Sequence, residues 1–232
     1  MIKDISAIVP ALDSNRYSPD GDLLKFAGTT LIEWKISQLL KIFEKKDVYV
    51  STPSGKIAAI AEGAGVKVIR RGKENNFSDM IKSSASGTDK KYLLWTNTTS
   101  PFIGPKHYLA MIKMFLSLDR NKYDSLVSVL KMNEYFFYKG SPMNFDISKF
   151  QSRTELEPLF KLTNGCSIAL KETCLSYGKD YGGKPFLSEV DKFVATEISE
   201  IGDGAMLNDL VAEYFRRDLD ITDKALWQEQ NK

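Results

Sequence analysis

A long polar loop between Pro10 and Gly28 carries the side chains of this sequence that are most suited to chemistry. It contains two cationic side chains, Arg16 and Lys25. A polyphosphate needs backbone N–H groups and a positive charge to offset its negative charges. The loop lacks the Gly-x-x-x-x-Gly-Lys-Ser/Thr and Gly-x-Gly-x-x-Gly patterns of the common phosphate loops. The residues alone therefore leave two interpretations, a site for a nucleotide or phosphate and a plain surface loop.

The elements that position this loop are alternating apolar runs and amphipathic stretches. Strands are predicted at 5–9, 47–51, 66–69 and 92–96, and helices at about 32–43, 55–63, 76–85 and from Pro105 onward. Four alternations with short connections predict βαβ crossovers and an α/β fold with a mostly parallel sheet. Because ligands of such sheets bind beyond the carboxyl ends of the strands, we expect the site after Val9, Ile69 and Thr96.

The second half, from Tyr123, changes to an α+β pattern. Strands are expected at 125–130, 166–170 and 194–198, a hairpin at 135–138 with its turn at Gly140 and Pro142, and a closing helix around Leu207. We expect one domain over residues 1–232. Residues of about 132–162 would form an arm inserted in it, and this arm is a candidate for dimer contact.

Composition excludes several classes of partner. Acidic and basic residues nearly balance to a formal charge of +2, which gives no reason to expect nucleic acid or an anionic membrane. No apolar run approaches the roughly 20 residues needed to cross a bilayer, and residues 1–4 lack the apolar core of a signal peptide. Cys166 and Cys174 are expected to be reduced and packed as small hydrophobes. These features predict a cytoplasmic protein.

A series of short motifs then points to a family. Residues 7–11 (Ala-Ile-Val-Pro-Ala), the loop, and residues 28–32 (Gly-Thr-Thr-Leu-Ile) match without a gap an opening that runs roughly Ile-Pro-Ala-Arg-x-Gly-Ser-Lys-Gly, then Gly-Lys-Pro-Leu-Ile. Further matches follow in order at 47–52, 58–66, 93–101, 124–129, 164–165 and 189–191. In this order the sequence resembles the N-acylneuraminate (CMP-sialic acid) cytidylyltransferase family, which also includes CMP-Kdo synthetases.

The resemblance implies a Rossmann-like nucleotidyltransferase domain with an inserted α+β dimerisation arm. It implies a homodimer that joins CTP to the hydroxyl of a sialic-acid-like or related acidic sugar, releases pyrophosphate and uses Mg²⁺. Charge builds on the phosphoryl oxygens and the leaving pyrophosphate in such a reaction, so cations carry most of the catalysis. The resemblance gives Arg16 and Glu197 catalytic roles, with Glu197 also binding the metal. It places Asn164 at the acceptor sugar. The residues that it places at the nucleotide are Pro10, Ala11, Arg16, Asp22, Arg71, Asn97 and Ser100.

The loop departs from the family pattern at several positions. The family's arginine is replaced by Leu12, and its two glycines by Ser14 and Tyr17. Arg16 stands where the family has a lysine, which preserves a cation, and Asp22 replaces an asparagine. These departures leave two interpretations, a rebuilt triphosphate site and a relative that keeps the fold without the activity.

The expected metal-binding Asp-x-Asp reads Glu197-Ile-Ser199, so one carboxylate remains and a hydroxyl takes the second place. Glu200 or Asp203 are alternative second ligands. These departures leave three hypotheses: a divergent cytidylyltransferase, a nucleotidyltransferase with a different acceptor such as a phosphonate, and a non-catalytic relative that acts as a binding or scaffold protein.

Overall fold

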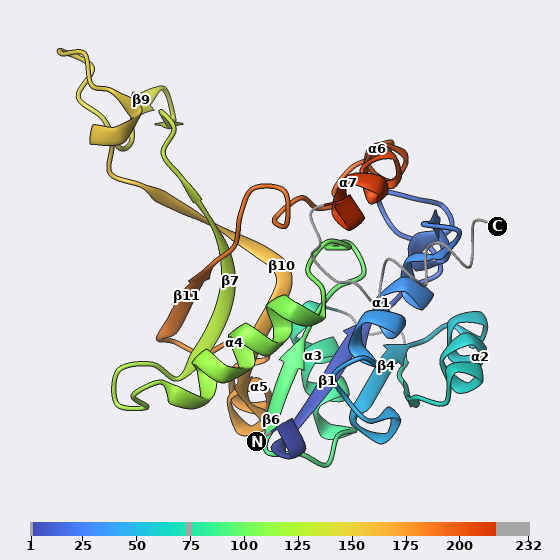
Figure 1. The fold of residues 1–232 in the computed structure, drawn as a ribbon. Coiled ribbons are helices and arrows are strands. Elements are labelled where there is room, and N and C mark those ends of the chain that lie inside the picture. The colour runs from blue at the N-terminus through green and yellow to red at the C-terminus, as the bar shows by residue number, and fades with distance from the viewer. Residues whose placement is uncertain (1, 73–75, 217–232) are drawn as a thin grey trace.

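A seven-stranded sheet forms the centre of the molecule, in the strand order β11-β7-β10-β6-β1-β4-β5 (Figure 1). The computed structural model describes residues 2–72 and 76–216. Trp227, which the sequence suggests as a helix-packing residue, lies outside them. The strands of this sheet are β1 (Ile5–Pro10), β4 (Val48–Thr52), β5 (Lys67–Arg70), β6 (Tyr92–Trp95), β7 (Ser125–Met132), β10 (Leu159–Leu170) and β11 (Pro185–Glu189). All neighbours pair in parallel except β10, which is antiparallel to β6 and β7. The predicted mostly parallel sheet is confirmed.

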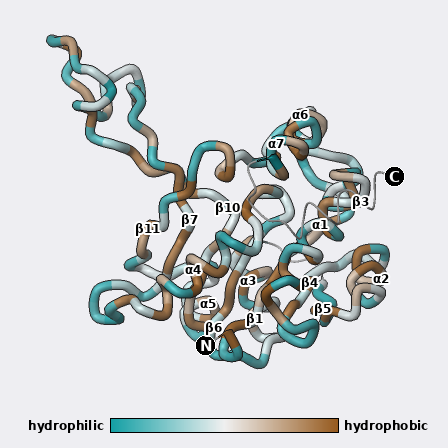
Figure 2. The backbone as a smooth tube through the Cα atoms, in the orientation of Figure 1, coloured by the Kyte–Doolittle hydropathy of each residue, from teal (hydrophilic) through white to brown (hydrophobic). Residues whose placement is uncertain are grey.

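Helices cover both faces of the sheet. One face packs against α1 (Leu31–Leu39), α2 (Gly55–Ala64) and α4 (Pro105–Ser117), and the other against α3 (Phe77–Ser86) and α5 (Lys171–Tyr177). Along β1, Ala7 and Val9 join the first core and Ile8 joins the second. Because β1 is buried on both faces, its sequence is almost continuously apolar instead of alternating. Hydrophobic residues accordingly gather along the central strands (Figure 2).

Polar residues set the starts of the helices. Thr30 and Glu33 form a capping box at α1, and the side chains of Ser54 and Asn76 accept backbone N–H bonds at the starts of α2 and α3. Such caps satisfy N–H groups that have no partner within the helix. They end the loops that follow β1, β4 and β5 at defined residues, and the loops after β1 and β5 border the crevice described below.

The order of the strands creates a crevice at the carboxyl ends of β1 and β6. From β1 the chain adds β4 and β5 on one side and then returns to place β6 on the other side. Ligands of open α/β sheets bind where the strand order reverses in this way. The polar loop after β1 contains a short 3-10 turn, η2 (Gly21–Leu23), and is followed by the small hairpin of β2 (Lys25–Phe26) and β3 (Thr29–Thr30).

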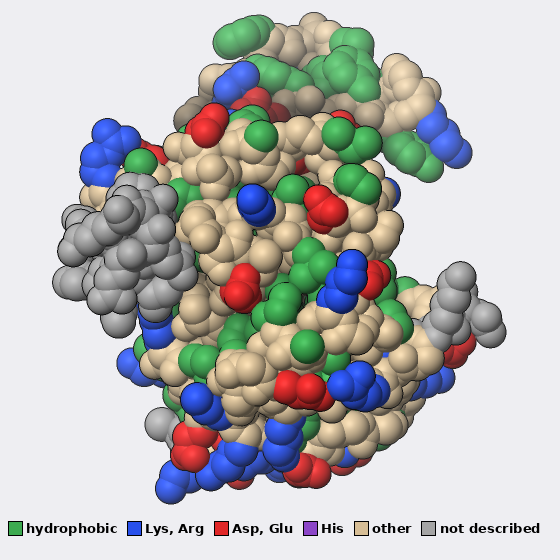
Figure 3. Space-filling view, turned by 90° about the vertical axis from the view of Figure 1, so that its right-hand side faces the viewer, with side chains coloured by type: hydrophobic (Ala, Val, Ile, Leu, Met, Phe, Trp, Pro, Cys, Tyr) green, Lys and Arg blue, Asp and Glu red, His purple; other side chains and the backbone are tan. Residues whose placement is uncertain are grey.

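Long extensions of β7 and β10 carry an arm away from the sheet (Figure 1). Its tip contains the predicted hairpin, formed by β8 (Phe137–Tyr138) and β9 (Ser141–Pro142), and a 3-10 turn, η4 (Arg153–Glu155). The strand expected at 166–170 begins already at Leu159, because its first residues pair with β7 along the arm. Hydrophobic side chains are exposed on the arm (Figure 3), among them Phe137, Tyr138, Met143, Ile147 and Phe150. Contact of the arm with a second copy stays a prediction.

The strand expected at 194–198 is wrong. This segment forms turns and loop, and the strand of this region is β11, which pairs in parallel with β7 at the edge of the sheet. Val194 and Ile198 are buried because they join two separate hydrophobic clusters, and the backbone N–H of Ile198 donates to the carbonyl of Thr99. A buried loop and a buried β-strand can have the same apolar pattern in the sequence.

The closing helix is divided into α6 (Asp203–Asp209) and α7 (Val211–Arg216). Both pack on an aromatic cluster that includes Trp34 of α1 and Phe102 of the loop after β6. Both helices therefore contact α1 and the loop after β6, and the second of these borders the crevice.

Candidate functional site

A cavity of about 450 Å³ opens at the carboxyl ends of β1 and β6. Eight of the predicted site residues line it: Pro10, Ala11, Arg16, Asp22, Arg71, Asn97, Asn164 and Glu197. Ser100, the ninth, does not line the cavity but lies fully buried beside it. The structure thus brings together residues from five separate parts of the chain.

Asp22 fastens the polar loop at the edge of this cavity. Its Oδ2 accepts a 2.6 Å bond from the backbone N–H of Leu12, and its Oδ1 accepts bonds of 2.5 Å from the hydroxyls of Tyr17 and Thr98. Tyr17 stands at a position where the family pattern has glycine, and Thr98 belongs to the loop after β6. The replaced residues therefore form a new network that joins the two loops of the site.

Burial shifts the pKa values of the Asp22 carboxyl and the Tyr17 hydroxyl in this network. It raises the pKa of Asp22, against the opposing effect of hydrogen bonds from Thr98, Tyr17 and Leu12. Burial and the neighbouring Asp22 carboxyl also raise the pKa of Tyr17 well above its usual value. Tyr17 consequently remains a protonated donor to Asp22.

Gly21 is a loop residue whose role the sequence analysis missed. It has a φ of +53°, and a Cβ atom added to it would lie 2.2 Å from the carbonyl oxygen of Leu12. Only glycine fits this position, since a side chain would meet backbone that cannot move independently. In the sequence, a glycine inside a polar loop is the feature that could have indicated this role.

A buried lysine supports the loop after β6. Nζ of Lys35, on α1, donates to the carbonyls of Ser100 at 2.9 Å and Ile103 at 3.1 Å, and to the hydroxyl of Tyr108 at 2.8 Å. Trp34 adds a 2.8 Å bond from its indole N–H to the carbonyl of Pro101. Burial lowers the pKa of Lys35 to about 7. In the sequence Lys35 is one polar residue on an amphipathic helix, and nothing local marked it.

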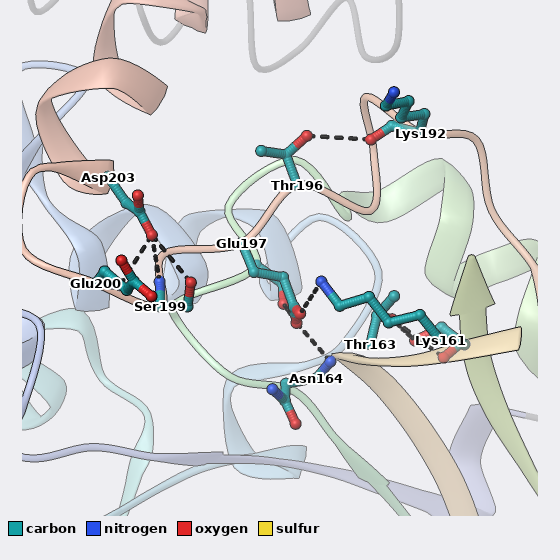
Figure 4. A network of polar contacts seen from close by, with 11 residues as sticks. Lys161, Thr163, Asn164, Lys192, Thr196, Glu197, Ser199, Glu200 and Asp203 are labelled. Carbon is teal, nitrogen blue, oxygen red and sulfur yellow. Dashed lines mark hydrogen bonds and ion pairs between the residues drawn. The ribbon is translucent and has the colours of Figure 1, made fainter. Parts of the chain in front are cut away.

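Glu197 lies at the centre of a second network (Figure 4). Its Oε1 accepts a 2.6 Å bond from the backbone N–H of Asn164 and a 3.0 Å bond from the hydroxyl of Ser100. Its Oε2 lies 3.6 Å from Nζ of Lys161, and its side chain is only 8% exposed. The carboxylate therefore already has two donors and an ammonium group around it.

Asn164 itself lies at an irregularity inside β10, where the register with β7 shifts between Leu162 and Ser167. Its carbonyl accepts a 3.1 Å bond from the backbone N–H of Asn97. A Cβ added to Gly165, the next residue, would lie 1.8 Å from Cδ1 of Ile103, so a larger residue there would displace this buried side chain. The pair therefore lies within a strand, at a bulge or irregularity of its pairing with β7.

Two of the proposed second metal ligands, Ser199 and Asp203, bond to each other. Oδ2 of Asp203 accepts bonds from the backbone N–H groups of Ser199 and Glu200, at 2.7 and 2.9 Å, and from the Ser199 hydroxyl (Figure 4). Within residues 2–72 and 76–216 there is no group of three or more His, Cys, Asp or Glu side chains that could hold a metal ion. Magnesium takes near-octahedral oxygen ligands, commonly one or two carboxylates with phosphates and water. This donor set does not fit a preformed two-carboxylate site, and participation of magnesium stays a prediction.

Two arginines are the cationic side chains among the residues that line the cavity. Arg71 follows β5 and its backbone N–H donates to the carbonyl of Thr52, whereas its neighbour Arg70 forms a surface ion pair with Glu62 at 2.8 Å. The adjacent arginines thus separate into one cavity residue and one surface residue. Arg16 and Arg71 could both face an anionic ligand.

The cysteines behave as the sequence predicted. Cys166 and Cys174 are free and buried. Burial raises the pKa of both thiols, to about 12 for Cys174. They therefore stay protonated near neutral pH and pack as hydrophobic residues.

Comparison with known proteins decides the family. Residues 6–155 match the family model described as cytidylyltransferase. The chain belongs to the cytidylyltransferase family. Among the described residues, no helix is long and apolar enough to span a membrane.

Two curated relatives are N-acylneuraminate cytidylyltransferases. The chain is 25% identical over 206 residues to the N-acylneuraminate cytidylyltransferase of Streptococcus agalactiae serotype III (strain NEM316), which covers 82% of this chain and 49% of the relative. It is 27% identical over 139 residues to N-acylneuraminate cytidylyltransferase A of Danio rerio, covering 57% of this chain and 32% of the relative. The chain spans about half the length of the first of these relatives.

Solved structures share the fold at low sequence identity. A CMP:2-keto-3-deoxy-manno-octonic acid synthetase complexed with CTP superposes with a TM-score of 0.63 at 12% identity, over 92% of this chain and 99% of that one. The 2-C-methyl-D-erythritol 4-phosphate cytidylyltransferase of Thermus thermophilus gives 0.59 at 14% identity, over 90% and 99% of the two chains. The predicted Rossmann-like nucleotidyltransferase fold is confirmed.

Proposed function

We propose that this protein transfers CMP from CTP to a hydroxyl of a sialic-acid-like or related acidic sugar. The acceptor oxygen forms a bond to the α-phosphorus of CTP, and the bond from that phosphorus to the oxygen that bridges to the β-phosphate breaks. Pyrophosphate leaves with the electron pair, and the proton of the acceptor hydroxyl passes to solvent. The observation that carries the proposal is the cavity at the strand switch point, which Arg16, Arg71 and Asn97 line together in a chain of the cytidylyltransferase family.

The residues of the cavity divide between the two substrates. Arg16 would bind the triphosphate and stabilise the charge that grows on the pyrophosphate. Arg71 and Asn97 would hold the nucleotide, and Asn164 would face the acceptor. Pro10 ends β1 and Ala11 follows it, and both line the cavity, where the backbone would approach the nucleotide closely.

The networks beneath these residues support preorganisation. Asp22 joins the two loops, and Lys35 supports the carbonyls of Ser100 and Ile103. Groups that are already oriented need not reorganise when charge develops in the transition state. A homodimer joined through the arm and a cytoplasmic location belong to the same proposal.

One observation favours a second candidate, a non-catalytic relative that binds a ligand. Glu197 stands where the family pattern expects a metal ligand, yet its oxygens already face Asn164, Ser100 and Lys161. A protein that kept the cavity without catalysis would bind a nucleotide and release no pyrophosphate.

Thermal unfolding with CTP, ATP, GTP and UTP, each with and without magnesium, tests the nucleotide site. A ligand that binds only the folded protein stabilises it by about 2.7 kcal/mol at 100 times its dissociation constant. We expect CTP to raise the melting temperature more than the other three nucleotides. No shift with any of them at millimolar concentration would contradict the proposal.

Pyrophosphate release from CTP with sugar-acid acceptors then separates the two candidates. Arg16→Ala should abolish turnover without changing the melting temperature of the free protein. Lys25→Ala, which removes an exposed cation from the same loop region, is the matched control. Normal turnover in Arg16→Ala would contradict the assigned role.

A further inference from the structure

A second, more enclosed cavity of about 270 Å³ lies beside the main one. The two share four lining residues: Pro10, Phe77, Asn97 and Asn164. The second cavity, here called the side chamber, extends between α3 and the strands β6, β7 and β10, where Ile81, Trp95, Val127 and Ser167 line it. A molecule in the main cavity could therefore extend into the side chamber past Asn97 and Asn164.

Asp180 is the acidic residue of the side chamber. Its Oδ2 accepts a 2.5 Å bond from the hydroxyl of Ser167. Burial raises the pKa of this carboxyl, against the opposing effect of the Ser167 bond. No step of the proposed reaction uses this group.

The chain after Asp180 is held firmly. The backbone N–H of Gly182 donates to the hydroxyl of Ser125 at 2.9 Å, and that of Gly183 donates to the carboxylate of Asp124 at 2.8 Å. A Cβ added to Gly182 would lie 2.5 Å from Oδ1 of Asp124. These contacts fix the turn against the start of β7, so Asp180 is placed by rigid neighbours and not by a loose loop.

The charge of the side chamber limits what it accepts. None of the thirteen lining residues, all within the described chain, is lysine or arginine. A carboxylate that entered would face the buried Asp180 without a compensating cation, and burying two like charges together is costly. A hydroxyl or an amine, in contrast, would donate a hydrogen bond to the Asp180 carboxylate, and the polar residues Thr96, Thr163 and Asn97 are among those that line the same chamber.

We propose that the side chamber binds the part of the acceptor remote from the reacting hydroxyl, and that Asp180 selects a hydroxyl or an amine there over a carboxylate. This inference rests on the proposed function and names the acceptor class of the same site. An acidic sugar would keep its own carboxylate in the main cavity, where Arg16 and Arg71 lie. Asp180 is then a specificity-determining residue.

The test compares wild type with Asp180→Asn, which keeps the shape and removes the charge. The probes are sugar acids whose substituent farthest from the carboxylate is a hydroxyl, an amine or a second carboxyl group. Binding is measured by titration calorimetry in the presence of CTP, and turnover by pyrophosphate release. We expect wild type to prefer the hydroxyl and amine probes over the carboxyl probe by about 10- to 100-fold, the range of one hydrogen bond to a charged group. In Asp180→Asn this preference should fall by about tenfold or more.

Glu172→Gln on α5 is the matched control, since it removes an exposed carboxylate from the element just before Asp180. The melting-temperature shift with CTP alone should be the same in all three proteins. An equal shift together with an unchanged probe preference in Asp180→Asn would overturn the inference and leave the proposed function intact. Failure of wild type to bind any hydroxyl or amine probe would also overturn it. Absence of a CTP shift in wild type would instead overturn the proposed function, and this inference with it.

Discussion

The backbone N–H of Asn164 donates a 2.6 Å hydrogen bond to Oε1 of Glu197. This contact joins the bulge of β10 to the segment that crosses the cavity, and the hydroxyl of Ser100 adds the loop after β6 to the same oxygen. Three segments that border the site thus meet at one carboxylate. The geometry favours a positioning role for Glu197.

Substitution of Glu197 distinguishes positioning from metal binding. In Glu197→Gln the amide oxygen still accepts from Asn164 and Ser100, so we expect the stability and the magnesium requirement for CTP binding to change little. Glu197→Ala leaves these donors and Lys161 without the carboxylate, and it should lower the free energy of unfolding by about 1–3 kcal/mol. Urea unfolding and magnesium titrations of CTP binding check this. A tenfold higher magnesium requirement in Glu197→Gln would point to a metal ligand.

The Asp22 network should respond in a graded way. Asp22→Ala removes the acceptor of three hydrogen bonds and frees both loops, so we expect lower stability and loss of the CTP-induced melting shift. Tyr17→Phe removes only one of these bonds and should cost about 1 kcal/mol. Differential scanning fluorimetry with and without CTP measures both effects. Equal effects of the two substitutions would contradict the central role of Asp22.

Alanine substitutions at Gly21 and Gly63 should have opposite effects on the stability of the protein. Gly21→Ala places a Cβ against the Leu12 carbonyl at positive φ, so it should destabilise the loop by more than about 1 kcal/mol and weaken CTP binding. Gly63 lies inside α2, and an added Cβ there would meet nothing within 4 Å. Gly63→Ala should therefore stabilise the protein by up to about 1 kcal/mol. Melting temperatures of the two variants give the test, and a stabilised Gly21→Ala would show that the loop backbone adapts.

Lys35 should make stability depend on pH. Its folded pKa of about 7 lies below its ordinary value of 10.5, so the unfolded chain binds more protons between these values. The free energy of unfolding should therefore rise with pH across this window, by at most about 1.4 kcal/mol per pH unit. Lys35→Met lacks the titrating group and should lack this component. Urea unfolding of both proteins at pH 7, 8 and 9 measures the difference, which should grow with pH; a constant difference would contradict the prediction.

The local patterns of the sequence predicted the βα units before the arm. Apolar runs and helical spacing record burial on one or two faces, and that burial acts over neighbouring residues. The order of motifs then placed eight residues in one cavity, Arg16 and Asn97 among them, because a family resemblance carries tertiary information that composition lacks. The strand expected at 194–198 failed for the converse reason, since an apolar pattern reports burial without saying what covers it.

The sequence by itself thus determined the alternating α/β core, the polar loop after β1, the hairpin of the arm and the identity of eight of the cavity residues. Only the tertiary structure decided that β10 enters the sheet antiparallel between β6 and β7, and that Lys35 supports the loop after β6. It also decided that Glu197 contacts Asn164 and Lys161, and that Asp180 lies in a side chamber. These contacts join residues far apart in the chain, so they depend on how the elements pack and leave no periodic trace in the sequence.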